Sequence, residues 1–241
     1  MASQHIIPNT LPSSLFDGSE FQALKLSLTD SSIFVPNPAV IQNGFRRSEL
    51  LPKSGAGLTS GVTTFHFSLM KDPKNPLNLA HEYQLVFIEP NDGTHVFEIK
   101  YGTAYQNTAN PPAVDKYTAD TLRLMSSSTA GWDKTKVLFQ TEFKPYMFHN
   151  FAITIDWNKA TLTAYYSQGN QNLKLVVPTT ANAVKVPGEF HVGMVKLPIG
   201  LTNSVVFDGI QESRIHESLI YAGVFVEDSG KGAVTTKPFS K

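Results

Sequence analysis

Three charged residues stand within four positions of the stretch "GFRRSELLP", residues 44–52. Its apolar residues and its flanking glycine and proline predict a short strand. In a strand, Arg47 and Glu49 share one face, whereas Arg46 points to the other. An arginine beside a carboxylate keeps the carboxylate ionised and fixes its orientation through a charge-assisted hydrogen bond. The stretch therefore predicts either a functional carboxylate facing a groove or a solvated ion pair on an edge strand.

A second carboxylate ends the apolar strand "EYQLVFIEP", residues 82–90. Strict alternation places Leu85, Phe87 and Glu89 on one face and the intervening residues on the other. That face changes from hydrophobic to acidic at its end, and apolar surroundings raise the pKa of a carboxyl group. Glu89 is therefore a candidate general acid. The alternative is a glutamate at a strand end that turns toward solvent.

A histidine occupies a comparable position in "EFHVGMVKLP", residues 189–198. Alternation sends every second apolar residue toward the core and places His191, Gly193 and Val195 on the opposite face. A glycine beside a histidine leaves room for a ligand. The alternative is a half-exposed histidine with no role beyond the sheet.

Two carboxylates and a histidine on one sheet face match the needs of glycoside hydrolysis. One carboxyl protonates the leaving oxygen, and the other carboxylate acts on the anomeric centre or on its water. We assign Glu49 as the ionised base and Glu89 as the acid, with Glu98 as the substitute if the pair does not converge. Carboxyl groups about 5–5.5 Å apart indicate retention, and about 6.5–9.5 Å indicates inversion, which this assignment favours.

The elements that must position these residues are strands. Alternating segments separated by Gly, Pro and Asn predict strands over 21–28, 61–70, 82–89, 94–102, 148–157, 160–168, 188–197 and 217–227. One short helix is expected within 115–125. So many short strands without a repeat or a composition break predict an all-β fold, a β-jelly roll or concanavalin-like two-sheet sandwich with a concave cleft. The chain is expected to form one domain over residues 1–241, with a polar tail from about 228 to 241 that wraps the surface or frays.

Composition excludes several classes of function. The chain has 20 basic and 20 acidic residues, so we expect no nucleic-acid partner. No apolar run approaches the about 20 residues that span a bilayer, so no membrane partner is expected either. There is no cysteine, and the histidines lack ligand spacing, so we expect neither a cofactor nor a metal site. No signal peptide is recognisable in "MASQHIIPNT".

Several segments in order resemble glycoside hydrolase family 131, a family of secreted fungal β-glucanases with a β-jelly-roll fold. They include "GFRRSELLP", "FHFSLMKDPKNPLNLAHEYQLVFIE", "FHVGMVKLP" and "QESRIHESLIYAGVFVEDS". The resemblance implies hydrolysis of β-1,3-, β-1,6- and β-1,4-linked glucans by an extracellular enzyme. We expect this enzyme to be a monomer. It carries the catalytic residues over to Glu49 and Glu89, with Arg47 as support. His191 is the first choice for an assisting histidine, and His216 is the second.

Two other functions stay open at this point. Jelly-roll polysaccharide lyases of the alginate type also carry an R-[ST]-E-L strand, which "RSEL" matches. Glu89 and Val195 stand where the lyases have a histidine and a catalytic tyrosine, and this difference favours a hydrolase. A carbohydrate-binding module or lectin, with the groove but not the chemistry, is the alternative that is not an enzyme.

Overall fold

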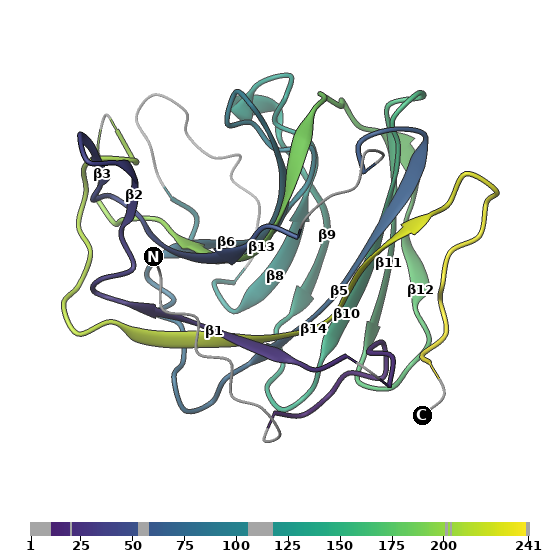
Figure 1. The fold of residues 1–241 in the computed structure, drawn as a ribbon, viewed down its shortest axis with the longest axis horizontal. Helices are drawn as coiled ribbons and strands as arrows, with labels where there is room; N and C mark the ends of the chain where they lie inside the picture. Colours follow the sequence, from purple (N-terminus) through teal and green to yellow (C-terminus); the bar gives the residue numbers. More distant parts are fainter. Residues whose placement is uncertain are drawn as a thin grey trace.

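Two antiparallel six-stranded sheets stacked face to face form the molecule (Figure 1). The computed structural model describes residues 11–19, 21–52, 58–105, 118–200, 202 and 204–239. We call the two layers the back sheet and the groove sheet. The all-β, jelly-roll sandwich expected from the strand pattern is confirmed.

The strands of the two sheets are interleaved in the sequence. In spatial order the back sheet contains β1 (Leu24–Thr29), β14 (His216–Asp228), β5 (Val62–Lys71), β10 (His149–Asp156), β11 (Thr161–Gln168) and β12 (Lys174–Ala181). The groove sheet contains β4 (Arg46–Leu50), β13 (Gly188–Lys196), β6 (Glu82–Pro90), β7 (Glu98–Gly102), β8 (Thr121–Met125) and β9 (Val137–Glu142). Segments far apart in the sequence therefore become neighbours, and β4 and β6 both pair with β13.

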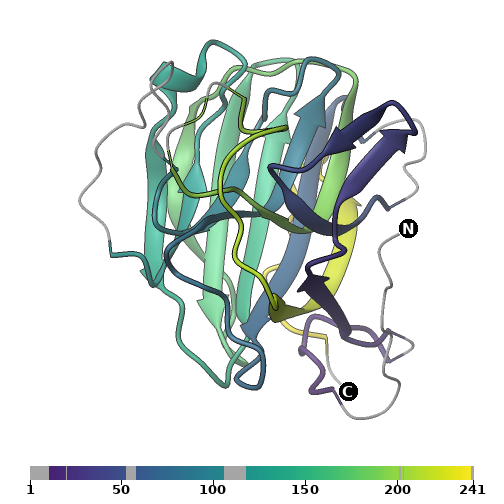
Figure 2. The ribbon, with the colours of Figure 1, turned by 90° about the vertical axis from the view of Figure 1, so that its left-hand side faces the viewer.

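Smaller elements surround the groove sheet. Strands β2 (Phe34–Asn37) and β3 (Val40–Gln42) form a separate hairpin, which Figure 2 shows at the end of the molecule that faces the viewer there. A short 3-10 helix, η1 (Trp132–Lys134), connects β8 to β9. Among the described residues no helix is long and apolar enough to cross a membrane.

Alternate side chains of both sheets meet in one hydrophobic core. Phe65 of β5 contacts Phe97 and Phe190, with ring centroids 5.9 and 5.0 Å apart. The buried groove-sheet residues Val86, Ile88, Ile99, Val192 and Met194 belong to the same cluster as Leu26, Phe67, Ile153 and Leu219 of the back sheet. The opposite face of the groove sheet is thereby left for polar side chains.

Two local expectations from the sequence are wrong. Residues 121–125 form strand β8 rather than a helix, because Leu122 and Leu124 alternate into the core with Arg123 between them on the other face. The rest of that segment, 115–117, lies outside the described residues. Leu85 is also in the core rather than on the groove face with Phe87. A register shift between Gln84 and Val86 places the consecutive residues Leu85 and Val86 both on the core side.

The described part of the C-terminal tail runs along the surface of the sandwich. The Thr235 amide and hydroxyl donate to the Glu227 carboxylate, and the Thr236 carbonyl accepts from Leu173. The ring of Phe239 lies 5.8 Å from that of Phe225. These contacts attach residues 235–239 to the back sheet.

A fully buried lysine joins the two sheets at one end. Lys196 of β13 is 0% exposed, and its ammonium contacts Glu217 at 2.6 Å and Glu212. The Tyr83 hydroxyl donates to the second oxygen of Glu217 at 2.9 Å. Burial raises the pKa of the Glu212 carboxyl, but hydrogen bonds from Lys196 and Asn78 outweigh burial and lower the pKa to about 2. The buried ammonium therefore has two carboxylate partners, and His81 also contacts Glu212, with Nε2 2.7 Å from its carboxylate.

We expect Lys196→Met to lower the free energy of unfolding by about 3–5 kcal/mol, because it leaves the Glu217 carboxylate buried without its cation. Chemical denaturation monitored by tryptophan fluorescence measures the change. Lys159→Met is the control, since Lys159 is 79% exposed and its pair with Asp156 is solvated. Equal midpoints for the two variants would contradict the role of Lys196.

Candidate active site

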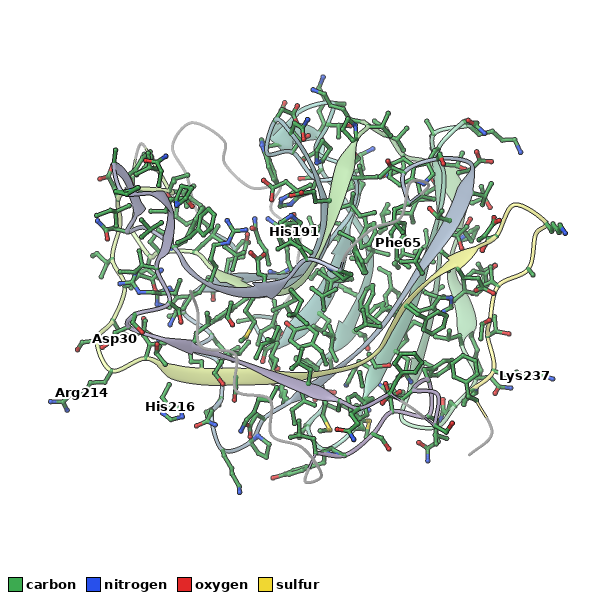
Figure 3. All side chains as sticks on the ribbon, viewed as in Figure 1. Asp30, Phe65, His191, Arg214, His216 and Lys237 are labelled. Atoms are coloured by element: carbon green, nitrogen blue, oxygen red, sulfur yellow. The ribbon has the colours of Figure 1, made fainter. Side chains whose placement is uncertain are left out.

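The groove sheet carries a cavity of about 430 Å³ on the face away from the core. Arg47, Phe87 and Glu89 are among its lining residues. Figure 3 shows His191 on this side of the molecule, above the layer of core side chains. Glu49 and His191 are covered more deeply, with side chains 4% and 5% exposed.

Strand register brings the candidate residues together. Glu49 of β4 is opposite Gly193 of β13, and His191 is opposite Phe87 of β6. Glu89 is opposite Glu189 at the end of the same ladder. Residues two apart in a strand share a face. The side chains of Glu49, His191, Phe87, Glu89 and Glu189 therefore all project toward the groove.

An imidazole links the two candidate carboxylates. Nδ1 of His191 lies 3.5 Å from Oε1 of Glu49, and Nε2 lies 3.6 Å from Oε2 of Glu89. A third carboxylate, Glu189, is 3.9 Å from Nε2, and its side chain is 69% exposed. The sequence therefore predicted correctly that Glu49, Glu89 and His191 share one face, and the structure brings them into one cluster.

Arg47 binds the Glu49 carboxylate through its guanidinium group. Its Nε donates to Oε2 of Glu49 at 2.6 Å, and its guanidinium carbon lies 4.8 Å from the ring centroid of Phe34 in β2. Burial raises the pKa of the Glu49 carboxyl, but the hydrogen bond from His191 and the charge of Arg47 outweigh burial and hold the pKa below its ordinary value. Glu49 is thus an ionised carboxylate at neutral pH although it is almost fully buried.

The missing side chain of Gly193 leaves room for the backbone of β4 at Glu49 rather than for a ligand. A Cβ on Gly193 would lie 2.3 Å from the Ser48 carbonyl oxygen and 2.5 Å from Cα of Glu49. The Gly193 carbonyl in turn accepts a hydrogen bond of 2.6 Å from the buried Tyr221 hydroxyl of the back sheet. The close approach of β4 to β13 therefore requires glycine at this position.

The other two candidates lie outside this cluster. His216 begins β14 in the back sheet, where it is exposed and pairs with Thr29. Figure 3 shows it on the far side of the core from His191. Glu98 is also on the groove face, but it belongs to β7, the strand next to β6. It is opposite Phe87 of β6 and contacts His95 and Lys100. Neither residue is within the Glu49–His191–Glu89 cluster.

Sequence reasoning missed several groove residues beyond the cluster. Gln84, Glu82, His95, Lys100 and Arg123 line the cavity with Glu89. The alternation of "EIKYG" contained the signal for Lys100, since it is two residues from Glu98. The alternation of Leu122, Arg123 and Leu124 contained the signal for Arg123, but the expected helix over this segment obscured it. Among the described residues, no group of three or more His, Asp or Glu side chains is placed to hold a metal ion.

Comparison with known families gives this site its context. Residues 3–232 match the family model described as the glycoside hydrolase 131 catalytic N-terminal domain. The chain belongs to glycoside hydrolase family 131. It is therefore a glycoside hydrolase, and a polysaccharide is its class of substrate. No curated protein matches the chain by sequence.

Two solved structures of family 131 share the fold. A β-glucanase catalytic domain from Podospora anserina is 23% identical with a TM-score of 0.70, and the match covers 95% of this chain and 79% of that one. A family 131 catalytic domain from Coprinopsis cinerea is 21% identical with a TM-score of 0.66, and the match covers 94% and 77%. These similarities establish the architecture, whereas the roles of single residues depend on the geometry described above.

We expect Gly193→Ala to displace β4 from β13 and to lower the free energy of unfolding by about 1–3 kcal/mol, the usual effect of overpacking. Thermal unfolding measures the change, and a crystal structure of the variant shows whether Glu49 has moved from His191. Gly230→Ala is the matched control, because an added Cβ there meets only the flexible Asp228 carboxylate at 3.1 Å. A variant with wild-type stability and an unmoved Glu49 would show that β4 tolerates the added methyl group.

Proposed function

We propose that this family 131 enzyme hydrolyses β-glucan in the groove, with Glu49 and Glu89 as its catalytic residues. The observation that carries the proposal is the cluster in which His191 contacts both carboxylates at 3.5 and 3.6 Å. Glycoside hydrolysis needs two carboxyl groups in different protonation states near one glycosidic bond. Glu49 is buried and bonded to Arg47, whereas Glu89 is more exposed, so the two carboxyl groups lie in different environments.

In the proposed mechanism Glu49 is the base and Glu89 the acid. Arg47 and His191 keep Glu49 ionised, so it can accept a proton from water or act on the anomeric carbon. Glu89 has a side chain that is 33% exposed and lines the cavity, so it can reach the leaving oxygen. The two carboxylates contact different nitrogens of one ring, which supports the wider carboxyl separation of an inverting enzyme, about 6.5–9.5 Å.

The proposed substrates are glucans with β-1,3, β-1,6 and β-1,4 linkages. Resemblance to the family supports this range of linkages. The cavity supports a sugar substrate more generally, because it has the aromatic residues Phe87, Tyr105 and Trp132 among its lining residues. Because polymeric glucan does not enter cells, the proposed location of the enzyme is extracellular. The enzyme is proposed to act as a monomer, because strand pairing within one chain brings Glu49, His191 and Glu89 together.

Product analysis tests the reaction class. The enzyme is incubated with laminarin, pustulan, cello-oligosaccharides and alginate, and product mass and linkage are determined. New reducing ends without unsaturated sugars are expected from the first three. An unsaturated uronic product from alginate would identify a lyase, and binding without cleavage would identify a carbohydrate-binding protein.

Glu49→Gln and Glu89→Gln are each expected to lower kcat on the best glucan by about 10²–10⁴-fold, the usual contribution of a general acid or base. Initial rates of reducing-sugar release measure the loss, and unchanged thermal unfolding shows that the fold is intact. Glu189→Gln is the matched control, because this carboxylate also lies near His191 but is 69% exposed. Full activity of either Glu49→Gln or Glu89→Gln would remove that residue from the mechanism.

Arg47→Lys is expected to lower kcat/KM by about tenfold to a hundredfold, because a lysine cannot supply the planar guanidinium that bonds Glu49. The pKa of Glu49 should rise toward its ordinary value, so activity should be lost at a higher pH as the solution is acidified. A pH profile of kcat/KM measures both effects.

Arg46→Lys is the matched control for this change. The Arg46 guanidinium points away from the groove and donates to the carbonyls of Asn43 and Phe45 at 2.9 and 2.8 Å. The pH profile of kcat/KM for Arg46→Lys should coincide with that of the wild type. Equal effects of the two substitutions would mean that Arg47 acts no differently from a general surface charge.

A further inference from the structure

A second group of polar and aromatic side chains lies on the groove sheet, toward β7 and β8. Its members are His95, Glu98, Lys100 and Trp132, and three of them line the same cavity as Glu89. Phe87 connects this group to the catalytic cluster, because its ring stacks on His191 at 4.5 Å and on His95 at 4.4 Å. The groove floor therefore continues from His191 through two further rings.

Trp132 is the half-buried indole of this group. Its ring meets His95 edge to face at 5.2 Å, and the Lys100 ammonium lies 5.9 Å from its centroid. Helix η1 presents it directly after Gly131, whose φ of 127° is a conformation that favours glycine. The second of the chain's two tryptophans, Trp157, is buried and bonded to Thr63. Trp132 is thus a half-buried tryptophan held in a fixed orientation at the cavity wall.

The charges beneath Trp132 are balanced. Lys100 contacts Glu82 at 2.7 Å and Glu98 at 3.6 Å, and Arg123 contacts Glu82 at 3.9 Å. Two carboxylates and two cations thus lie together, and three of these four side chains are almost fully buried. A site of this kind offers hydrogen bonds without a net charge, so it suits a neutral sugar better than a uronate.

We propose that Trp132, with His95 and Lys100, forms a distal subsite that stacks one neutral glucosyl ring of the polymer. The proposal deepens the proposed glucanase function and rests on it. Glu49 in β4 and Glu98 in β7 are separated by three strand spacings, about 14 Å, so a chain bound at both places lies across the strands. Trp132 supplies the flat apolar face, and His95 and Lys100 supply polar atoms for the sugar hydroxyls.

Chain-length kinetics of Trp132→Ala test this subsite. The substrates are β-1,3-, β-1,4- and β-1,6-linked gluco-oligosaccharides of increasing length, from the disaccharide upward. The variant should match the wild type on the shortest substrate that is cleaved, and it should lose about two- to tenfold in kcat/KM on those long enough to reach Trp132. Trp132→Phe, which keeps a ring, should recover part of the loss.

Tyr146→Ala is the control, because Tyr146 is an aromatic residue that is 79% exposed and outside the groove. It should match the wild type at every length. Equal kcat/KM of Trp132→Ala and wild type at all lengths would overturn the subsite, and so would an equal loss at all lengths including the shortest.

Tryptophan fluorescence separates failure of the subsite from failure of the proposed function. The same oligosaccharides should quench the wild-type emission, and Trp132→Ala should lose the length-dependent quenching because Trp157 is buried. If the wild type cleaves none of them but is quenched through Trp132, the glucanase proposal fails and the sugar site stands. Quenching that persists in Trp132→Ala would overturn the site whatever the activity.

Discussion

The arrangement of the groove depends on one buried carboxylate that stays ionised. Burial of an unpaired carboxylate costs several kcal/mol, so Glu49 at 4% exposure is stable only with its partners in place. Arg47 comes from its own strand, whereas His191 comes from the next, so the pairing register of β4 and β13 decides whether the charge is compensated. Gly193 makes that register possible by letting β4 approach closely.

The pairing of β6 with its neighbours β13 and β7 extends the polar face across the sheet. The shift at Leu85 places Gln84 on the groove side opposite Lys100, while Phe87 stays opposite His191 and Glu98. Leu85 is the additional residue at this shift. Without it, one half of β6 would present its polar side chains to the core. A local irregularity of the ladder therefore keeps both halves of the strand compatible with a continuous hydrophobic interior.

Much of the fold and part of the site could be predicted from the sequence. Alternation located eight strands and assigned Glu49, Phe87 and His191 to the groove face, because that pattern reflects a one-sided core. It failed at Leu85, since a register shift has no mark in the sequence. It also missed β12, an edge strand that contains Pro178, because proline is tolerated only where no ladder bond is needed.

Exposure distinguishes the two carboxylates more clearly than their sequence surroundings do. Both carboxylates belong to strands of the groove sheet, yet the Glu89 side chain is 33% exposed and that of Glu49 only 4%. A group held by a guanidinium and an imidazole has little freedom to move, whereas a group at a strand end can follow a leaving oxygen. Two chemically identical side chains therefore suit different steps of one reaction, because the fold fixes one of them and leaves the other accessible.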